Sequence, residues 1–333
     1  MRMTKKMQAL AAGIMLTLAM GMVAGCGGDA KEAKQDGRAQ VGIVQLVEHT
    51  ALDAANKGFV DALAAKGYKE GENIVYDRQN AQADQSNLQN IAHRFANNKV
   101  DLICAIATPA VQTVANVTQD IPIVATAVTD YKAAKLIKDN VKPGTNVTGT
   151  TDMNPVAAQL DLILKLVPQA QTIGAIYCSS EVNSQLQVDI LKEAAAARGV
   201  EVKEATVSTV NDIQQAANSL IGDVQAIYVP TDNILASAMP TLAIVTEEAK
   251  VPVFCGEGGM VKAGGVATLG IDYYKLGVQT GEMAAEILQG KAQPATMAIQ
   301  EQKEFKTIIN MKVAKKIGLT IPEELLQDAE VVE

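Results

Sequence analysis

Residues 41–63 read VGIVQLVEHTALDAANKGFVDAL, and this stretch decides the fold class. Its first seven residues are mostly apolar and β-branched, which is typical of a buried strand, whereas residues 52–63 carry apolar side chains at helical spacing. A short buried strand followed by an amphipathic helix is the repeating unit of a parallel sheet that is covered by helices on both faces. The stretch therefore predicts an α/β protein.

The same alternation continues along the chain. We expect further strands at residues 74–79, 101–107 and 122–127, so that a first sheet ends near Thr150. A second series of strands is expected at residues 172–177, 200–207, 226–229, 251–255 and 266–269, followed by another near 307–310. The prediction is two doubly wound parallel-sheet lobes of similar size, joined by a hinge.

Residues 142–151, KPGTNVTGTT, separate the two series of strands. Proline and glycine break helices and the threonines suit an extended crossover, so we place the hinge there. The expected domains are a signal peptide (1–25), a lipidated tether (26–40), an N-terminal lobe (41–150), a C-terminal lobe (151–270), a return to the N-terminal lobe (271–296), and a closing strand and helix of the C-terminal lobe (297–333).

The N-terminus has the pattern of an export signal. Arg2, Lys5 and Lys6 precede an uncharged, largely apolar run at residues 7–23. This run is marginal against the roughly 20 apolar residues that a membrane-spanning helix needs, so we interpret it as a signal peptide.

A cysteine follows the signal directly. The sequence Val23-Ala24-Gly25-Cys26 resembles the lipobox of bacterial lipoproteins, which implies lipidation at Cys26 and a location in the cell envelope, outside the cytoplasm and anchored to the membrane. Residues 27–40 contain no leucine, isoleucine, valine or aromatic residue, which suits a flexible tether.

Composition excludes several classes of function. The chain carries 29 basic and 37 acidic side chains, three of the basic ones in the signal, so the exported remainder has a net charge of −11 and nucleic acid is not expected as a partner. Cys104, Cys178 and Cys255 show no CxxC spacing, and the chain has only two histidines. We therefore expect buried free thiols, with no metal site and no cofactor.

Polar side chains follow almost every predicted strand. In open parallel sheets, ligands bind beyond the carboxyl ends of the strands, where loops lead into helix N-termini. The segments at these ends are EHTALD (48–53), TP (108–109), VTD (128–130), SSEVNS (179–184), TDN (231–233), GEGG (256–259) and DYY (272–274). The GEGG segment lacks the GxGxxG spacing and GK[ST] ending of nucleotide sites, so a nucleotide is not expected.

Several of these segments belong to longer runs that resemble a known family. The runs are QLVEH (45–49) with ALD (51–53), NAQADQSNL (80–88), AIATPA (105–110), TAVTD (126–130), NVTGT (146–150), residues 177–184, PTDN (230–233) and GIDY (270–273). Together they resemble the tryptophan/tyrosine-type ABC-transporter substrate-binding lipoproteins, across essentially the whole exported chain. Cys178 departs from the pattern, because a polar residue such as asparagine is expected there.

The resemblance implies the type I periplasmic-binding-protein architecture, with the ligand held between two lobes. It also implies a receptor for an amino acid, with an aromatic one as the narrower option, that delivers to a membrane permease driven by an ATPase and performs no chemistry. The candidate ligand-binding residues are Gln45, Glu48, His49, Thr108, Ala127, Thr129, Asp130, Ser179, Ser180, Asn183, Ser184, Thr231, Asp232, Asn233, Glu257, Asp272 and Tyr273.

An amino acid needs hydrogen-bond donors for its carboxylate and an acceptor for its ammonium. Ser179, Ser184, Thr108 and Thr129 are the candidate donors, and Asp130, Asp232, Glu48 and Asp272 are the candidate acceptors. Serine, threonine and aspartate at such positions suit helix N-caps equally well. With no tryptophan and four phenylalanines, the chain does not indicate an all-aromatic cage.

Other functions stay open at this point. A nucleoside or a sugar would fit the same cleft, and a lipoprotein sensor would use it to signal to a partner. A secreted enzyme is disfavoured because the chain has no GxSxG elbow, no HExxH motif and no evident cysteine–histidine pair, although paired carboxylates remain an option.

Overall fold

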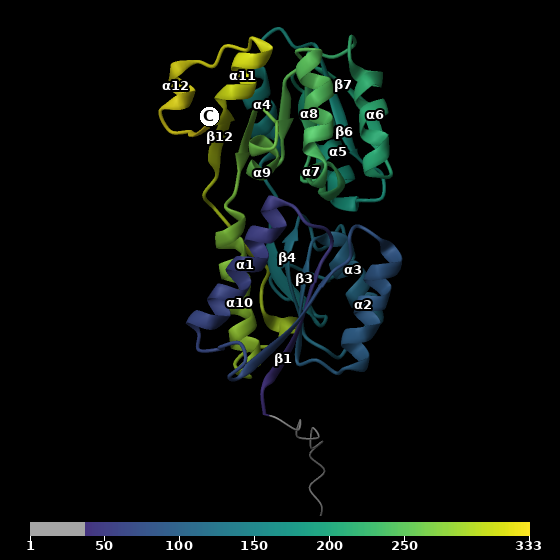
Figure 1. Cartoon of the computed structure of the whole chain (residues 1–333), viewed down its shortest axis with the longest axis vertical. Coiled ribbons are helices and arrows are strands. Elements are labelled where there is room, and N and C mark those ends of the chain that lie inside the picture. Colours follow the sequence, from purple (N-terminus) through teal and green to yellow (C-terminus); the bar gives the residue numbers. More distant parts are fainter. Residues whose placement is uncertain (1–36) are drawn as a thin grey trace, which may run out of the picture. The chain divides into compact units, whose positions relative to one another are not determined.

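The computed structural model describes residues 37–333 (Figure 1). The predicted signal peptide, Cys26 and most of the tether lie outside the described residues. The first strand begins at Ala39, so it includes the last two residues of the predicted tether. Residues Arg38–Glu333 form one structural unit that is built from two α/β lobes, each with a mostly parallel sheet, so the predicted fold class is confirmed.

The first lobe contains a six-stranded sheet in the order β11-β5-β4-β3-β1-β2, and all of its neighbouring strands run parallel. Its strands are β1 (Ala39–Gln45), β2 (Ile74–Asn80), β3 (Leu102–Ile106), β4 (Ile123–Val128), β5 (Val147–Thr151) and β11 (Gln300–Glu301). Its helices are α1 (Thr50–Ala65), α2 (Gln85–Asn97), α3 (Thr108–Val117) and α10 (Tyr273–Leu288), with the short 3-10 helix η2 (Pro294–Thr296).

The second lobe contains a seven-stranded sheet in the order β13-β12-β10-β9-β8-β6-β7, in which only the β10–β12 pair is antiparallel. Its strands are β6 (Thr172–Cys178), β7 (Glu201–Val207), β8 (Ala226–Val229), β9 (Val253–Cys255), β10 (Ala267–Gly270), β12 (Lys306–Asn310) and β13 (Glu330–Val332). Its helices are α4 (Val156–Leu166), α5 (Val182–Ala196), η1 (Val210–Asp212), α6 (Ile213–Leu220), α7 (Asn233–Ser237), α8 (Met239–Glu248), α9 (Gly258–Lys262), α11 (Met311–Ile317) and α12 (Glu323–Leu326).

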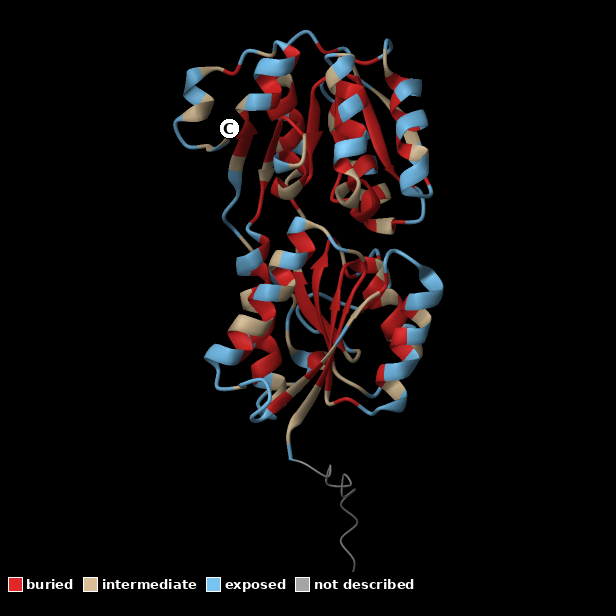
Figure 2. Cartoon of the chain, viewed as in Figure 1, coloured by how far each residue is buried: buried red, intermediate tan, exposed pale blue. Residues whose placement is uncertain are grey.

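Burial follows the pattern that a helix-covered parallel sheet requires. The central strands β3 and β4 are buried along their whole length, and the helices turn a buried face to the sheet and an exposed face to solvent (Figure 2). In the first lobe α10 lies beside α1 at very close range, because a Cβ atom added at Gly277 would come within 1.9 Å of the backbone oxygen of Ala55. A glycine at this crossing therefore keeps α10 in the first lobe, far along the sequence from α1.

The strand order locates the place where a ligand can bind. Both sheets contain the order 2-1-3-4-5, as β2-β1-β3-β4-β5 in the first lobe and β7-β6-β8-β9-β10 in the second. In such sheets the strand order reverses beside the first strand, and the loops at the carboxyl ends there diverge and leave a crevice.

The chain crosses between the lobes at three places, and two of them differ from the prediction. Residues 147–151 form strand β5 inside the first sheet, so the first crossing is the segment 152–155 and not 142–151. Gln300 and Glu301 pair with β5, so this part of the segment 297–333 belongs to the first lobe and not to the second. β5 reads VTGTT, and its glycine and threonines hide the apolar pattern of a strand, whereas β11 is an exposed two-residue strand at the edge of the sheet and has no such pattern.

Two further features concern the described residues only. Cys104, Cys178 and Cys255 are buried free thiols, as predicted. Within residues 37–333, no helix combines the length and the apolar character that a bilayer crossing requires.

Candidate functional site

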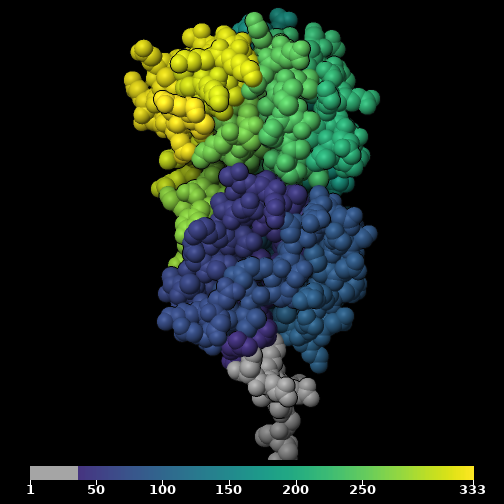
Figure 3. All heavy atoms as spheres, viewed as in Figure 1, coloured from purple at the N-terminus to yellow at the C-terminus, as the bar shows by residue number. Residues whose placement is uncertain are grey.

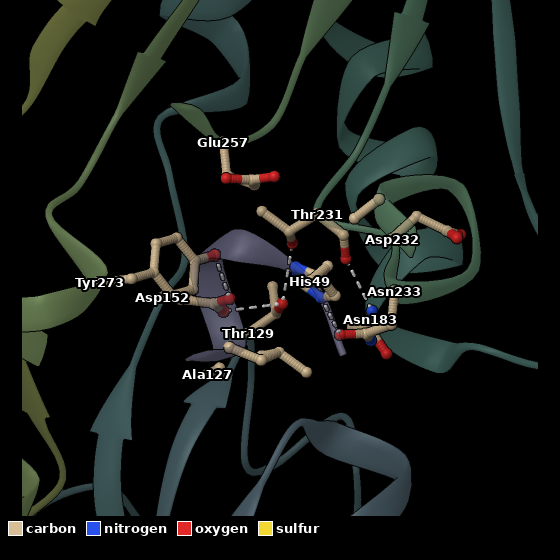
Figure 4. Close-up of a pocket in the computed structure, with 12 residues that line it drawn as sticks. His49, Ala127, Thr129, Asp152, Asn183, Thr231, Asp232, Asn233, Glu257 and Tyr273 are labelled. Atoms are coloured by element: carbon tan, nitrogen blue, oxygen red, sulfur yellow. Dashed lines mark hydrogen bonds between the residues drawn. The ribbon is translucent and has the colours of Figure 1, made fainter. Parts of the chain in front are cut away.

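A pocket lies between the two lobes, and both contribute to its walls (Figure 4). It is lined by His49, Leu52, Ala127, Thr129, Asp152, Asn183, Thr231, Asp232, Asn233, Ala236, Glu257 and Tyr273. Its empty volume is about 280 Å³, including space open to solvent, of which about 10 Å³ admits the centre of a water molecule. Ligand pockets usually measure about 300–1,000 Å³. The lobes or their side chains must therefore move apart before a ligand can enter.

The lobes touch across this pocket. His49 Nε2 lies 3.4 Å from Asn233 Oδ1, and the hydroxyl oxygens of Thr129 and Thr231 are 3.3 Å apart. From the face shown in Figure 3, the segment at the start of α1 fills the junction between the lobes. The structure therefore has the two lobes closed on one another.

Gln45 shapes the loop that presents His49. The Nε2 atom of Gln45 donates to the backbone oxygen of Val47 at 2.9 Å and to Asp53 Oδ1 at 2.6 Å, and its Oε1 atom accepts from Asn56 Nδ2 at 3.0 Å. Gln45 is itself buried and does not line the pocket. Its hydrogen bonds tie the end of β1 to the first two turns of α1, so Gln45 positions His49 and does not face a ligand.

Strained backbone at the end of β4 presents Thr129. Ala127 has φ +55°, a left-handed conformation that is unfavourable for a residue with a Cβ atom. The pairing of β4 with β5 shifts register between Ala125 and Val128, so the strain coincides with a bulge. Strained residues and bulges cluster where a protein must aim a side chain, and here they lie at the pocket.

A directional chain of hydrogen bonds crosses the cleft and ends at Asp152. Thr129 donates its only hydroxyl proton to Asp152 Oδ1 at 3.0 Å, so Thr231 is the donor in the contact between the two threonines, and the Thr231 hydroxyl in turn accepts from Gln187 Nε2. Tyr273 donates its hydroxyl to Asp152 Oδ2 at 2.7 Å. Each carboxylate oxygen of Asp152 thus has one partner and a second acceptor site to spare. Burial raises the pKa of Asp152 above its ordinary value.

Asp232 stabilises the second lobe from within. Its Oδ2 atom accepts from the backbone N–H of Cys178 at 2.6 Å and from Ser184 Oγ at 2.8 Å, and its Oδ1 atom accepts from the N–H of Leu235 at 2.9 Å. Burial raises the pKa of Asp232. Asp232 therefore caps α7 and ties this helix to the end of β6. Groups of the protein itself already donate to both oxygens of its carboxylate.

Glu181 lies behind the pocket and orients two amides that line it. Its Oε2 atom accepts from Asn183 Nδ2 at 2.9 Å and from Asn233 Nδ2 at 2.6 Å. Burial, together with the nearby carboxylate of Asp232, raises the pKa of Glu181 to about 8. Two buried carboxylates close together disfavour each other's charge. The amide donors of Asn183 and Asn233 offset part of this cost at Glu181.

Glu257 is the third buried carboxylate at the pocket. It caps α9, accepting from the backbone N–H groups of Gly259 and Met260, the second at 2.7 Å. Burial raises the pKa of Glu257 to about 7 despite these donors. Asp152, Asp232 and Glu257 give the pocket an acidic lining, and no lysine or arginine is among the described residues that line it.

The structure brings nine of the predicted residues together in the pocket. They are His49, Ala127, Thr129, Asn183, Thr231, Asp232, Asn233, Glu257 and Tyr273. Their common feature is position, because each is one of the last residues of a strand or follows the carboxyl end of one within a few residues.

Eight predicted residues do not line the pocket. They are Gln45, Glu48, Thr108, Asp130, Ser179, Ser180, Ser184 and Asp272. Two of them are caps, Asp130 of a turn and Asp272 of a helix.

Three of the four predicted ammonium acceptors are among these eight residues. Glu48 is exposed, and Asp130 accepts from the backbone N–H groups of Lys132 and Ala133, each at 2.8 Å. Asp272 is the N-cap of α10. None of the three carboxylates lines the pocket, so in this closed arrangement none of them is placed to meet a ligand ammonium there.

The predicted carboxylate donors are divided. Ser184 donates to Asp232, and the exposed Ser179 and Ser180 contact the backbone of Val207 and the thiol of Cys178. Thr108 begins α3, and its buried hydroxyl has no hydrogen-bond partner in the described part of the chain, although it lies outside the pocket. Of the four candidates, only Thr129 lines the pocket.

The sequence analysis missed three lining residues, Leu52, Asp152 and Ala236. Asp152 is the important omission, because it is a buried carboxylate that lines the pocket. The sequence carries a signal for it, since Asp152 directly follows β5, but residues 142–151 have the composition of a crossover, which hides the end of that strand. Leu52 and Ala236 lie on helices, where an apolar residue gives no sign that it faces a ligand.

Residues 40–333 match the family model described as ABC transporter substrate binding protein. The chain belongs to this family. It is 44% identical over 310 residues to the tyrosine-binding protein of Clostridioides difficile (strain R20291), a match that covers 91% of this chain and 90% of that protein. The resemblance inferred from the sequence is therefore confirmed, and the chain is a substrate-binding protein of an ABC transporter.

Two solved structures of such proteins lie close to this one. A crystal structure of an ABC domain in complex with L-Trp from Streptococcus pneumonia is 40% identical, with a TM-score of 0.86 over 89% of this chain and 100% of that one. A ligand-free, open substrate-binding protein with adhesive properties from Clostridium difficile is 46% identical, with a TM-score of 0.68 over 89% and 99%. The fit is better to the complex although its identity is lower, which agrees with the closed lobes described above.

Proposed function

We propose that this substrate-binding protein binds an aromatic L-amino acid in the pocket between its lobes. The observation that carries the proposal is the hydrogen-bond chain across the cleft, which runs from Thr231 through Thr129 to the buried carboxylate of Asp152. Relatives that bind tyrosine or L-Trp support the choice of ligand class.

The head group of an amino acid suits this chain of donors and acceptors. When the lobes open, the contact between Thr129 and Thr231 is lost, and the Thr231 hydroxyl becomes a free donor for the ligand carboxylate. The ammonium group then bonds to the spare acceptor sites of Asp152. A charge-assisted hydrogen bond contributes about 1.5–3 kcal/mol, so two or three would account for much of a micromolar affinity of about −8 kcal/mol.

The apolar lining provides a surface for the side chain. Leu52, Ala127 and Ala236 are the aliphatic residues of the pocket, and the ring of Tyr273 lies at its edge (Figure 4). Ligand pockets commonly combine such an apolar surface with a few polar groups that fix the orientation of the ligand. The two alanines present only methyl groups, which leaves room for a ring once the lobes separate.

A thermal-shift screen of the purified protein tests the ligand class. At a ligand concentration of 100 Kd, binding to the folded state alone stabilises it by about 2.7 kcal/mol. We expect L-tyrosine or L-tryptophan to raise the midpoint of unfolding, with the ligand recovered chemically unchanged. If a sugar or a nucleoside raised it and no aromatic amino acid did, the proposal would be wrong.

The proposal extends to where the protein works. The lipobox-like sequence supports a lipid on Cys26, which would hold the protein outside the cytoplasm near the permease of an importer. Substitution of Cys26 by alanine should move the protein from the membrane fraction to the soluble one. A Cys26→Ala protein that stayed with the membranes would exclude this anchor.

A further inference from the structure

Two residues that line the pocket carry a buried polar atom that has no hydrogen-bond partner among residues 37–333. They are Asn183, at its Oδ1 atom, and the ring of His49, at its Nδ1 atom. The same ring uses its other nitrogen, Nε2, to contact Asn233 Oδ1 on the opposite lobe at 3.4 Å. Buried polar atoms almost always have a partner, so an orphaned one at a binding pocket indicates a place for a ligand atom.

The neighbours of His49 determine whether Nδ1 donates or accepts. Asn233 Nδ2 donates to Glu181 Oε2 at 2.6 Å, which turns the amide oxygen of Asn233 toward His49. An oxygen at that place can only accept, so the ring proton is on Nε2 and Nδ1 is a bare acceptor. Burial lowers the pKa of His49 to about 4, so the ring is neutral at neutral pH and this assignment holds there.

His49 lies apart from Asp152 in the pocket. Figure 4 shows Asp152 and Tyr273 on one side of the Thr129–Thr231 contact and Asn233 on the other, with His49 between that contact and Asn233. If the ammonium group is at Asp152, the side chain of the ligand extends toward His49. The ligand atom that meets Nδ1 is then a side-chain donor.

We propose that His49 Nδ1 accepts a hydrogen bond from the ligand side chain, so that the pocket selects tyrosine or tryptophan over phenylalanine. The inference rests on the proposed function and narrows it to aromatic amino acids that carry a donor, a phenol O–H or an indole N–H. Phenylalanine would leave Nδ1 buried and unpaired, and sites built for a substrate hydroxyl reject analogues that lack it for this reason.

Glu181 takes part in this selection as a positioning residue. It does not line the pocket, but its carboxylate fixes the amide of Asn233, and the amide fixes the ring proton of His49. The contact between Asn233 and His49 exists only across the closed cleft, because the two residues belong to different lobes. The ring proton of His49 is therefore fixed on Nε2, and Nδ1 becomes a fixed acceptor, when the lobes close.

The test is calorimetric titration of the purified protein with L-tyrosine, L-tryptophan and L-phenylalanine. We expect phenylalanine to bind at least about 10-fold more weakly than tyrosine, which is about 1.4 kcal/mol. Equal affinity for tyrosine and phenylalanine would overturn the inference and leave the proposed function intact. No binding of any of the three would overturn the proposed function itself.

Two substitutions at His49 separate the role of Nδ1 from the size of the ring. Asparagine can place its Oδ1 atom where Nδ1 was, whereas glutamine reaches the position of Nε2 and offers no acceptor at Nδ1. We expect His49→Asn to keep the preference for tyrosine over phenylalanine and His49→Gln to reduce it to less than about 3-fold. If His49→Gln kept the full preference, Nδ1 would not be the selecting atom.

The role of Glu181 has a spectroscopic test. His49 and His93 are the two histidines of the chain, so their ring nitrogens are readily assigned by NMR with His93→Gln. We expect the His49 proton on Nε2 in the tyrosine complex, retained in Glu181→Gln and redistributed in Glu181→Met, which has no acceptor for Asn233. A proton on Nδ1 in the wild-type complex would contradict the assignment directly.

Discussion

Replacement of Asp152 by asparagine should separate ligand binding from stability. Asp152 is 4% exposed and has hydrogen bonds from Tyr273 at 2.7 Å and Thr129 at 3.0 Å. Asparagine has the same shape, and its amide oxygen can accept from Tyr273 while its NH₂ group faces the Thr129 oxygen. The substitution therefore removes the negative charge with little change in packing.

The expected loss of affinity follows from the ammonium group of the ligand. A hydrogen bond to a charged group contributes about 1.5–3 kcal/mol, so the affinity for L-tyrosine should fall by about 10- to 150-fold. The free energy of unfolding without ligand should not fall. Burial raises the pKa of Asp152 above its ordinary value, so at pH 7 the folded state is destabilised by this charge, and asparagine removes that penalty.

Titration calorimetry at pH 7 measures the first quantity and urea denaturation measures the second. Asp130→Asn is the matched control, because this carboxylate caps an exposed turn outside the pocket. We expect the control to bind L-tyrosine as the wild type does. Unchanged affinity in Asp152→Asn, or an equal loss in Asp130→Asn, would refute the placement of the ammonium group.

Three further predictions concern the scaffold around the pocket. Gly277→Ala should lower the free energy of unfolding by about 1–3 kcal/mol, because the new Cβ atom would lie 1.9 Å from the Ala55 oxygen. Urea denaturation measures this change, and an unchanged free energy would contradict the close helix crossing. Ala127→Gly should raise the free energy of unfolding by up to about 1 kcal/mol, because glycine tolerates the φ of +55°. Ala125→Gly in the same strand is the control and should lower the free energy of unfolding by about 0.5–1 kcal/mol. Equal losses in the two variants would argue against backbone strain at Ala127. The pKa of Glu257, raised by burial to about 7, predicts that its contribution to stability is complete below about pH 4.5 and is lost as the pH rises through 7; unfolding measured from pH 5 to 8 should show this decline in the wild type and a smaller one in Glu257→Gln.

The sequence predicts the position of polar residues that lie just beyond the carboxyl ends of the strands. Thr129, Thr231 and Asn233 each follow a run of apolar residues that is long enough to identify a buried strand, and a polar residue just beyond such a run is placed at the edge of the sheet by geometry alone. The pocket residues of both lobes were found in this way. Asp152 was not, because β5 reads VTGTT and its glycine and threonines look like a crossover.

The sequence does not determine which side chains of a strand-end loop point into the pocket. Asp130 and Asp232 both follow a strand, yet one caps an exposed turn while the other lies buried against the pocket. Which residue of such a loop turns inward depends on the backbone path, and the bulge at Ala127 sets that path for Thr129. A local conformation of this kind has no signature in hydrophobic periodicity.

The most direct measurement is a crystal structure of the protein with L-tyrosine. We predict the ligand between the two closed lobes, with its ammonium group within hydrogen-bond distance of Asp152 and its phenol O–H donating to His49 Nδ1. An aromatic amino acid bound elsewhere, or bound in this pocket with its ammonium group at His49, would contradict the account.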